Sequence, residues 1–397
     1  MQLHDRIPAI DSQQASPEMW HILTESSVPV AEFALALSRS TDVVSWLPSM
    51  SLFGILRKGT QSSVSEESSR LRKVHFPLQR GYSRFSSGPL FQSFNKIEGL
   101  LSLESRAPER SALVCTTSFW APVAQLWPGP IIYYATDFTF AYEGLRSGRV
   151  RSADRALCRI ADLVCPNSAN LASYFLDQCY CPPDRIVVLP NATRAANIRS
   201  LPCSFPDPLP DDVPPLPRPI AGVIGNMAGN VDWTLLRNTI EHSPKYSWLF
   251  VGPTSMAIRD RREREARTTV MRSGRACFIG PKPYQDLFRY ARALDVAVMP
   301  YRKLEPTYSG SATRFYEHLA AGRPILATRS VEELLHKQPL LHLVDGWAEL
   351  VRELERLRKE PQDGHEETRR LASQSETWEA RAQTMVEALH RMKRIPK

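Results

Sequence analysis

The sequence predicts an α/β fold with two doubly wound domains in tandem. Short apolar runs alternate with helix-forming segments in both halves of the chain, as in parallel sheets that helices cover on both faces. A proline-rich stretch separates the two series. The length of 397 residues is too great for one ordinary core and fits two domains of about 150–200 residues each.

The first half contains the first alternating series. Several of its expected strands are continuous apolar runs, and Ser168 is a suitable N-cap for the last helix because its hydroxyl can accept a backbone hydrogen bond. We expect strands at Trp20–Thr24, Asp42–Leu47, Lys73–Pro77, Ala112–Thr116, Pro130–Ala135, Leu163–Pro166 and Arg185–Leu189, and helices at Val30–Arg39, Val150–Ile160 and Ser168–Gln178.

Residues 201–219 differ from the segments on either side. They hold eight prolines and no glycine, and they have little that could form a core. Proline removes backbone donors and stiffens the chain, so a semi-rigid connector between two domains is the main interpretation. A surface loop inside one domain is the alternative. The predicted first domain is therefore 1–200.

The second half repeats the alternation. The expected strands are Ile220–Ile224, Ser247–Val251, Ala276–Ile279, Val296–Met299, Ile325–Ala327 and Leu341–Val344. The expected helices are Trp233–Glu241, Ile258–Arg272, Tyr284–Ala293, Ala312–Ala321, Trp347–Lys359 and a long segment, Glu366–Lys393, that can be broken near Ser375. These elements predict a second domain over 220–370 and a closing helix over 371–397.

Composition narrows the class of protein. The formal net charge of +8 suits an anionic partner such as a nucleotide, a phospholipid surface or nucleic acid, but the basic residues are too evenly spread for a nucleic-acid-binding module. No apolar run reaches the ~18–20 residues that span a bilayer, and residues 1–17 lack a signal-peptide core, so we expect a cytoplasmic protein. We expect the seven cysteines to be reduced, and no metal site or cofactor.

The most informative stretch is Asp295–Thr328, a buried strand followed by a polar loop and a helix. Small residues at 309–313 let a ligand approach the backbone, and the free amides of a helix start attract anions. Arg314 can add a charge-assisted contact to a phosphate. Glu317 can accept hydrogen bonds from the paired hydroxyls of a ribose. A common helix start with a surface glutamate is the alternative interpretation, and His318 could face either the cleft or the core.

The run Arg314–Ile325 (RFYEHLAAGRPI) resembles the nucleotide-sugar motif of GT-B glycosyltransferases, whose usual form is KLYEYLAAGKPV. Upstream, Cys277–Leu287 is similar to their nucleobase loop, and Gly222–Met227 to the first strand and turn of their donor domain. Trp378–Arg381 resembles their closing helix, which crosses back to the N-terminal domain. Within that family, the chain resembles bacterial exopolysaccharide and teichuronic-acid enzymes, including the xanthan-type glucuronosyltransferase.

The resemblance implies two Rossmann-like domains that face a cleft, and a nucleotide-sugar donor, most simply a UDP-sugar. The donor-binding residues that it implies are Gly225, Asn226, Met227, Lys282, Tyr284, Arg302, Ser309, Gly310, Ser311, Thr313, Arg314 and Glu317. Two features depart from the family. Ser309 replaces the first of two glutamates that many retaining members carry, and the usual Arg and Lys are missing from the turn at 226–229. Phosphate charge would then be balanced by Arg314, with Arg302 or Lys303, and the branch would be inverting.

In the first half, Asp137 follows an apolar strand at its carboxyl end, where open α/β sheets place ligand-binding groups. A carboxylate at a cleft can take a proton from a hydroxyl, and the matching aspartate has the proposed base role in the xanthan-type enzyme. Capping of the next helix is the alternative. Glu143 is a second candidate base, and Asn191 matches the Pro-Asn turn that precedes the family's linker.

The acceptor is predicted only as a class, a hydroxyl on a polysaccharide, a lipid-linked sugar or another molecule. The apolar segment Leu47–Leu56, followed by Arg57 and Lys58, could lie on an anionic membrane surface, although a core segment is the alternative. A GT-B relative that binds a nucleotide sugar without transferring it, an epimerase or an inactive partner subunit, is the second hypothesis for function.

Overall fold

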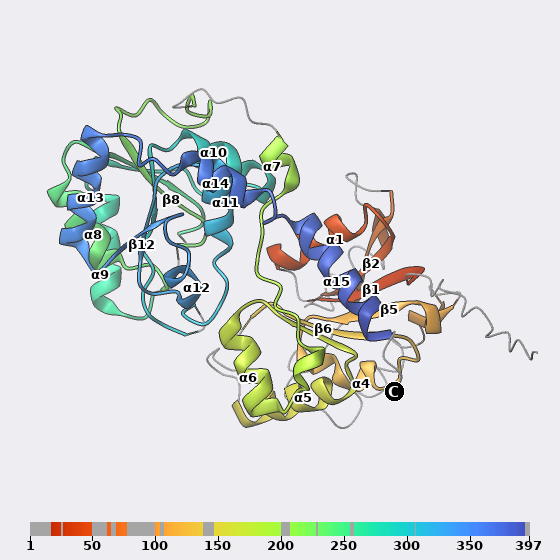
Figure 1. The fold of residues 1–397 in the computed structure, drawn as a ribbon. Coiled ribbons are helices and arrows are strands. Elements are labelled where there is room, and N and C mark those ends of the chain that lie inside the picture. Colours follow the sequence, from red (N-terminus) through yellow and green to blue (C-terminus); the bar gives the residue numbers. More distant parts are fainter. Residues whose placement is uncertain are drawn as a thin grey trace, which may run out of the picture.

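The computed structural model consists of two α/β units, each built on one sheet (Figure 1). It describes residues 17–24, 27–49, 62–64, 69–77, 99, 101–103, 107–137, 147–199, 207–227, 229–254, 258–305 and 307–393. Figure 1 shows the unit that contains β1–β7 beside the unit that contains β8–β13, with the connecting chain between them. The two doubly wound domains that the sequence predicts are therefore confirmed.

The first sheet has seven strands in the order β3-β4-β2-β1-β5-β6-β7. Every neighbouring pair is parallel except the edge pair β3 and β4. The strands are β1 (Met19–Leu23), β2 (Asp42–Ser49), β3 (Ser62–Val64), β4 (Leu71–Pro77), β5 (Ala112–Cys115), β6 (Ile131–Ala135) and β7 (Leu163–Pro166). Strands β5, β6 and β7 are buried along their whole length, which explains their continuous apolar sequence.

Helices cover both faces of this sheet, and a separate core cluster lies on each face. The helices of the first half are α1 (Val28–Leu37), α4 (Ala121–Ala124), α5 (Ser147–Ile160), α6 (Ala169–Cys179) and, toward the second unit, α7 (Ala195–Arg199). Short 3-10 turns lie at Pro108–Arg110, Ser118–Trp120 and Pro183–Arg185. Ser168 is the N-cap of α6 as expected, since its Oγ accepts the backbone N–H of Leu171 at 3.1 Å.

The second sheet has six strands, all parallel, in the order β10-β9-β8-β11-β12-β13. They are β8 (Ile220–Ile224), β9 (Ser247–Val251), β10 (Ala276–Phe278), β11 (Val296–Met299), β12 (Ile325–Thr328) and β13 (His342–Val344). The helices are α8 (Trp233–His242), α9 (Arg261–Met271), α10 (Leu287–Ala293), α11 (Thr313–Ala321), α12 (Glu332–Leu335), α13 (Trp347–Lys359), α14 (Glu366–Ser373) and α15 (Trp378–Lys393), with a 3-10 turn at Tyr284–Asp286.

One expected strand is wrong. Residues 185–189 run beside β7 but form only an isolated bridge between Ile186 and Val164 and two flanking backbone hydrogen bonds. A 3-10 turn precedes this segment and Pro190 follows it, so the ladder cannot extend. The break expected near Ser375 is confirmed, because α14 ends at Ser373 and α15 begins at Trp378.

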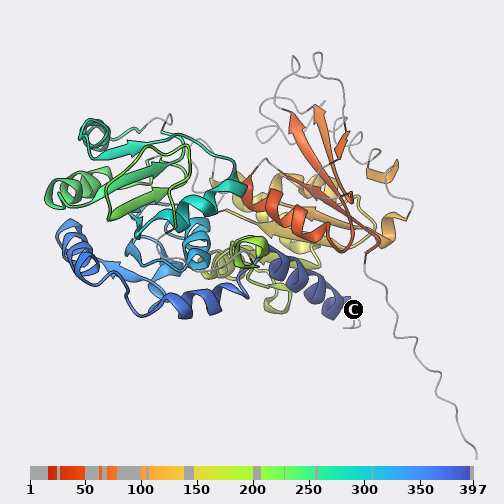
Figure 2. The same cartoon turned by 90° about the horizontal axis from the view of Figure 1, so that it is seen from above.

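The chain returns to the first unit at its end. Figures 1 and 2 both show α15 beside α1, away from the other helices of the second half. Trp378, Ala382 and Met385 of α15 belong to one core cluster of the first sheet. In the proline-rich stretch, the described residues 207–219 pack on the second unit, where Arg292 pairs with Asp207 and Val213 joins the core. The exact domain boundaries remain predictions.

The segment predicted to contact a membrane lies almost wholly outside the described residues, which end at Ser49 and resume at Ser62. Glu143, the second candidate base, also lies outside them. Within the described part of the chain, no helix is both long and apolar enough to cross a bilayer.

A buried ion pair fixes the end of α11. The guanidinium of Arg369 is fully buried (0% exposed), pairs with Asp363 and donates to the carbonyls of Gly322 (3.1 Å) and Leu340 (2.7 Å). Burial works to raise the pKa of Asp363, but hydrogen bonds from His342 and Arg369 hold that pKa well below its usual value. Gly322 is the left-handed C-cap of α11 (φ 76°), so Arg369 ties α14 to the end of that helix.

Removing this cation should destabilise the protein strongly. Arg369→Leu removes the guanidinium that pairs with the buried Asp363 carboxylate and leaves His342 as its remaining side-chain partner, and the expected loss is about 3–5 kcal/mol of unfolding free energy. Denaturant unfolding measures it. The neighbouring Arg370 makes one surface pair with Glu367, so Arg370→Leu is the control and should change stability by about 0.5 kcal/mol or less. Similar losses for both variants would contradict this role.

Candidate functional site

A cavity of about 390 Å³ lies between the two units. Both halves of the chain line it, so it exists only in the assembled two-domain structure. From the first half come Val28, Pro29, Thr136, Asp137, Asn167 and Asn191. From the second half come Ile224, Gly225, Asn226, Asn230, Tyr284, Leu287, Tyr301, Thr307, Gly310, Ser311, Ala312, Thr313, Arg314, Glu317, His318 and Val331.

Sheet topology explains this location. In the second sheet the strand order reverses between β8 and β11, which are neighbours. Ile224 is the last residue of β8, Gly225 follows it, and Tyr301 follows the end of β11. In the first sheet, Thr136 and Asp137 follow β6, and Asn167 follows β7. The cavity therefore joins the carboxyl ends of both sheets, where open α/β folds place their ligands.

The start of α11 projects into this cavity. Its N-terminal amides are only partly satisfied by the protein. Glu333 accepts the backbone N–H of Ala312 at 3.0 Å, while the amides of Thr313 and Arg314 have no acceptor among the described residues. Free amides at a helix start, with the positive end of the helix dipole, favour an anionic group.

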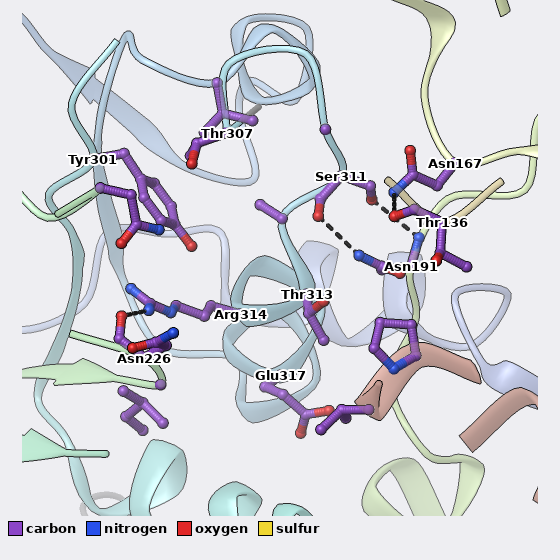
Figure 3. Close-up of a pocket in the computed structure, with 18 of the residues that line it drawn as sticks. Thr136, Asn167, Asn191, Asn226, Tyr301, Thr307, Ser311, Thr313, Arg314 and Glu317 are labelled. Carbon is purple, nitrogen blue, oxygen red and sulfur yellow. Dashed lines mark hydrogen bonds between the residues drawn. The ribbon is translucent and has the colours of Figure 1, made fainter. Parts of the chain in front are cut away.

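Arg314 lies across the turn that follows β8. Its Nη2 donates to the carbonyl of Asn226, and its guanidinium lies 5.2 Å from the centre of the Tyr301 ring. Figure 3 shows Arg314 directed toward Asn226 and Tyr301. The turn needs glycine at 225, because φ is 106° and a Cβ there would lie 2.4 Å from Arg314 Nε. Nη1 of Arg314 is buried and has no partner among the described residues.

Glu317 is buried (4% exposed) and accepts three hydrogen bonds. Oε1 accepts the hydroxyls of Tyr284 (2.6 Å) and Thr193 (3.0 Å), and Oε2 accepts the amide of Asn197 (3.0 Å). Burial raises the pKa of Glu317 to about 7, against the effect of these hydrogen bonds. An ionised carboxylate offers about four acceptor sites, so about one is left for a ligand hydroxyl. Two ribose hydroxyls would exceed that number.

The two halves meet around the same helix start. Asn191 donates its backbone N–H to Ser311 Oγ (3.0 Å) and its side-chain amide to the Ser311 carbonyl (2.8 Å). Ser168 Oγ donates to the carbonyl of Ser309 at 2.5 Å. Figure 3 shows Asn191 facing Ser311, with Thr136 and Asn167 beside them. The loop before α11 is therefore positioned by the first half of the chain.

Two amide side chains in this region have a fixed orientation. The Nδ2 groups of Asn167 and Asn191 donate to the carbonyls of Thr136 (2.5 Å) and Ser311, and only the nitrogen can do this. Their Oδ1 atoms are buried and have no partner among the described residues. Asn191 is expected from the sequence only as part of a turn. Asn167 is not among the expected site residues, although a polar residue directly after a buried strand is a signal for it.

Not all of the expected site residues line the cavity. The structure brings together Asp137 and eight expected donor-binding residues, which are Gly225, Asn226, Tyr284, Gly310, Ser311, Thr313, Arg314 and Glu317. The other four lie elsewhere. Met227 is in the core, Lys282 pairs with Asp212 (2.6 Å), Arg302 pairs with Asp260 (3.1 Å), and Ser309 donates to Glu305 (2.7 Å). Their role in donor binding stays a prediction.

Among the described residues, no cluster of three or more metal-ligating side chains is present.

Comparisons with known proteins point to one fold. No protein-family model matches the chain. TuaH of Bacillus subtilis (strain 168), assigned as a glycosyltransferase of teichuronic acid biosynthesis, is 22% identical over 105 residues. That match covers 26% of this chain and 25% of TuaH, so it spans about a quarter of the curated relative.

Solved structures match over nearly the whole length. HepE of Anabaena, in complex with UDP and glucose, gives a TM-score of 0.67 at 15% identity over 95% of this chain and 100% of that one. Trehalose-6-phosphate synthase of E. coli, bound with UDP-2-fluoro glucose, gives 0.64 at 11% identity over 96% and 100%. A further structure of trehalose-6-phosphate synthase, which concerns enzymatic glycosyltransfer with retention, gives 0.61 at 11% identity over 95% and 100%. The chain has the GT-B fold, two Rossmann-like domains that face a cleft, as the sequence resemblance implied.

The raised pKa of Glu317 predicts a pH-dependent stability. The pKa is about 7 in the folded protein against an ordinary 4.5, so folding favours the protonated carboxyl. The contribution of Glu317 to the free energy of unfolding is therefore complete below about pH 4.5 and is lost as pH rises to about 7. Melting temperatures of wild type and Glu317→Gln from pH 5 to 8 test this. The wild type should lose stability relative to the variant as pH rises, and parallel curves would contradict the prediction.

Proposed function

We propose that this protein is a glycosyltransferase that moves a sugar from a nucleotide-sugar donor, a UDP-sugar by preference, to a hydroxyl acceptor. One observation carries the proposal. A single cavity contains an anion-binding helix start and an arginine from one half, and a carboxylate, Asp137, from the other. The solved relatives with bound UDP and glucose or UDP-2-fluoro glucose support the same ligand class.

The donor is expected to bind mainly to the second half. Its diphosphate would accept hydrogen bonds from the amides of Thr313 and Arg314 and from the Arg314 guanidinium. The remaining acceptor site of Glu317 would take one ribose hydroxyl, with Tyr284 and Leu287 beside the nucleoside. Gly225 and Gly310 allow the backbone to approach the ligand closely.

Asp137 is proposed as the general base. As the acceptor oxygen forms its bond to the anomeric carbon, the bond from that carbon to the diphosphate breaks, and the hydroxyl proton passes to the carboxylate. Attack from the face opposite the leaving nucleotide inverts the anomeric configuration. The trehalose-6-phosphate synthase relative is connected with retention, so the configuration of the product is itself part of the test.

The acceptor class and the site of action rest on the sequence alone. The teichuronic-acid relative favours a cell-envelope polysaccharide or a lipid-linked precursor as the acceptor. Action in the cytoplasm, with contact to the inner face of the plasma membrane through residues 47–58, remains a prediction.

The Asp137→Asn variant tests this function. It keeps the shape of the side chain and removes its basicity, so turnover with the best UDP-sugar and acceptor should fall by about 10²–10⁴-fold. UDP affinity should be close to that of wild type, because the nucleotide binds the other half. Nuclear magnetic resonance of the product should show an inverted linkage.

Three results would count against the proposal in different ways. Near-normal turnover of Asp137→Asn, or a retained configuration, would remove Asp137 from the base role. Tight UDP-sugar binding without transfer to any acceptor would favour the non-transferring GT-B relative, and an absence of UDP binding would reject the donor site.

A further inference from the structure

His318 is the most unusual polar residue of the cavity. It lies on α11, one turn after Arg314, and lines the cavity with it. The side chain is buried (1% exposed), and neither Nδ1 nor Nε2 has a hydrogen-bond partner among the described residues. Buried polar groups nearly always have partners, so an imidazole with neither nitrogen satisfied needs an explanation.

Two neighbouring polar side chains of α11 do have hydrogen-bond partners. Glu317, the preceding residue, accepts three hydrogen bonds, and the hydroxyl of Tyr316 donates to Glu333. Among the described side chains of α11, the buried nitrogens without a partner are Arg314 Nη1 and those of the His318 ring, and both residues line the cavity. Residues four apart lie on the same face of a helix, so the two side chains are neighbours.

The imidazole is neutral in this environment. Burial and then the charge of Arg314 lower the pKa of His318 to about 3. A neutral imidazole carries one N–H donor and one acceptor nitrogen. It can therefore donate a hydrogen bond to an anion without the desolvation cost of a second buried cation beside Arg314.

We propose that His318 binds the nucleotide donor directly, donating its ring N–H to a phosphate oxygen that Arg314 also contacts. This inference rests on the proposed donor site and adds a residue to it. Phosphate oxygens are acceptors only, which matches two neighbouring N–H donors. A ribose hydroxyl already has a candidate partner in Glu317, which lines the same cavity.

The unpartnered nitrogens of His318 also predict how an apolar replacement affects the stability of the ligand-free protein. An apolar side chain of similar size would fill the same space without leaving two nitrogens unpartnered. His318→Leu should therefore keep or raise the melting temperature of the ligand-free protein. That property makes the variant suitable for a binding test. His318→Gln and His318→Asn complete the set, because each places an amide donor near one of the ring-nitrogen positions.

The test compares UDP, UMP and uridine by isothermal titration calorimetry on the full chain. His318→Leu should lose about 10-fold in affinity for UDP relative to wild type, the lower end for a hydrogen bond to a charged group. Uridine affinity should be unchanged, and UMP shows whether the contact is to the first phosphate. His318→Gln or His318→Asn should recover part of the loss.

His365 provides the matched control. It belongs to the same half of the chain and is absent from the cavity lining, so His365→Leu should bind UDP as wild type does. Wild-type UDP affinity in His318→Leu, or an equal loss for uridine and UDP, would overturn the phosphate contact while leaving the donor site intact. If the wild-type protein itself does not bind UDP, the proposed donor site is rejected, whatever the effect of the His318 variants.

Discussion

The site depends on one structural constraint, the fixation of the α11 start by both halves of the molecule. Ser168 and Asn191 of the first half bond to the loop at 309–311, and Thr193 and Asn197 bond to Glu317 one turn into the helix. These hydrogen bonds cross between elements more than 100 positions apart in sequence. A helix start held in this way presents its free amides to the interdomain cavity at a defined position, which is the preorganisation that binding of an anion requires.

The same contacts place Glu317 where three segments of the chain meet. Its carboxylate accepts hydrogen bonds from two residues of the first half, Thr193 and Asn197, and from Tyr284. The Tyr284 hydroxyl in turn accepts the Nε1–H of Trp378 in α15 at 3.4 Å. The closing helix α15, the segment at 193–197 and α11 therefore meet at one buried acid. A ligand hydroxyl that uses the remaining acceptor site would join this network, so donor binding and domain contact would be energetically coupled through Glu317.

Sequence patterns predicted the fold well because it is built from local signals. Continuous apolar strands such as Val296–Met299 and the Ser168 N-cap depend on near neighbours in the chain. The site was predicted in part. The resemblance around Arg314 and Glu317 indicated α11, and both residues line the cavity, but it could not show that Lys282 and Arg302 are held in ion pairs away from the cavity. The places of Tyr301 and His318 in the cavity lining depend on how distant segments pack, and no local pattern encodes that. Residues 185–189 were wrongly expected to form a strand, because this apolar run between prolines forms only one isolated bridge to β7.

A crystal structure with bound UDP tests the central claim most directly, that the interdomain cavity holds the diphosphate at the start of α11. The account predicts phosphate oxygens within about 2.7–3.2 Å of the amides of Thr313 and Arg314 and of the Arg314 guanidinium, with the nucleoside beside Tyr284. UDP bound at another surface, or phosphates turned away from α11 while the nucleoside occupies the cavity, would contradict it.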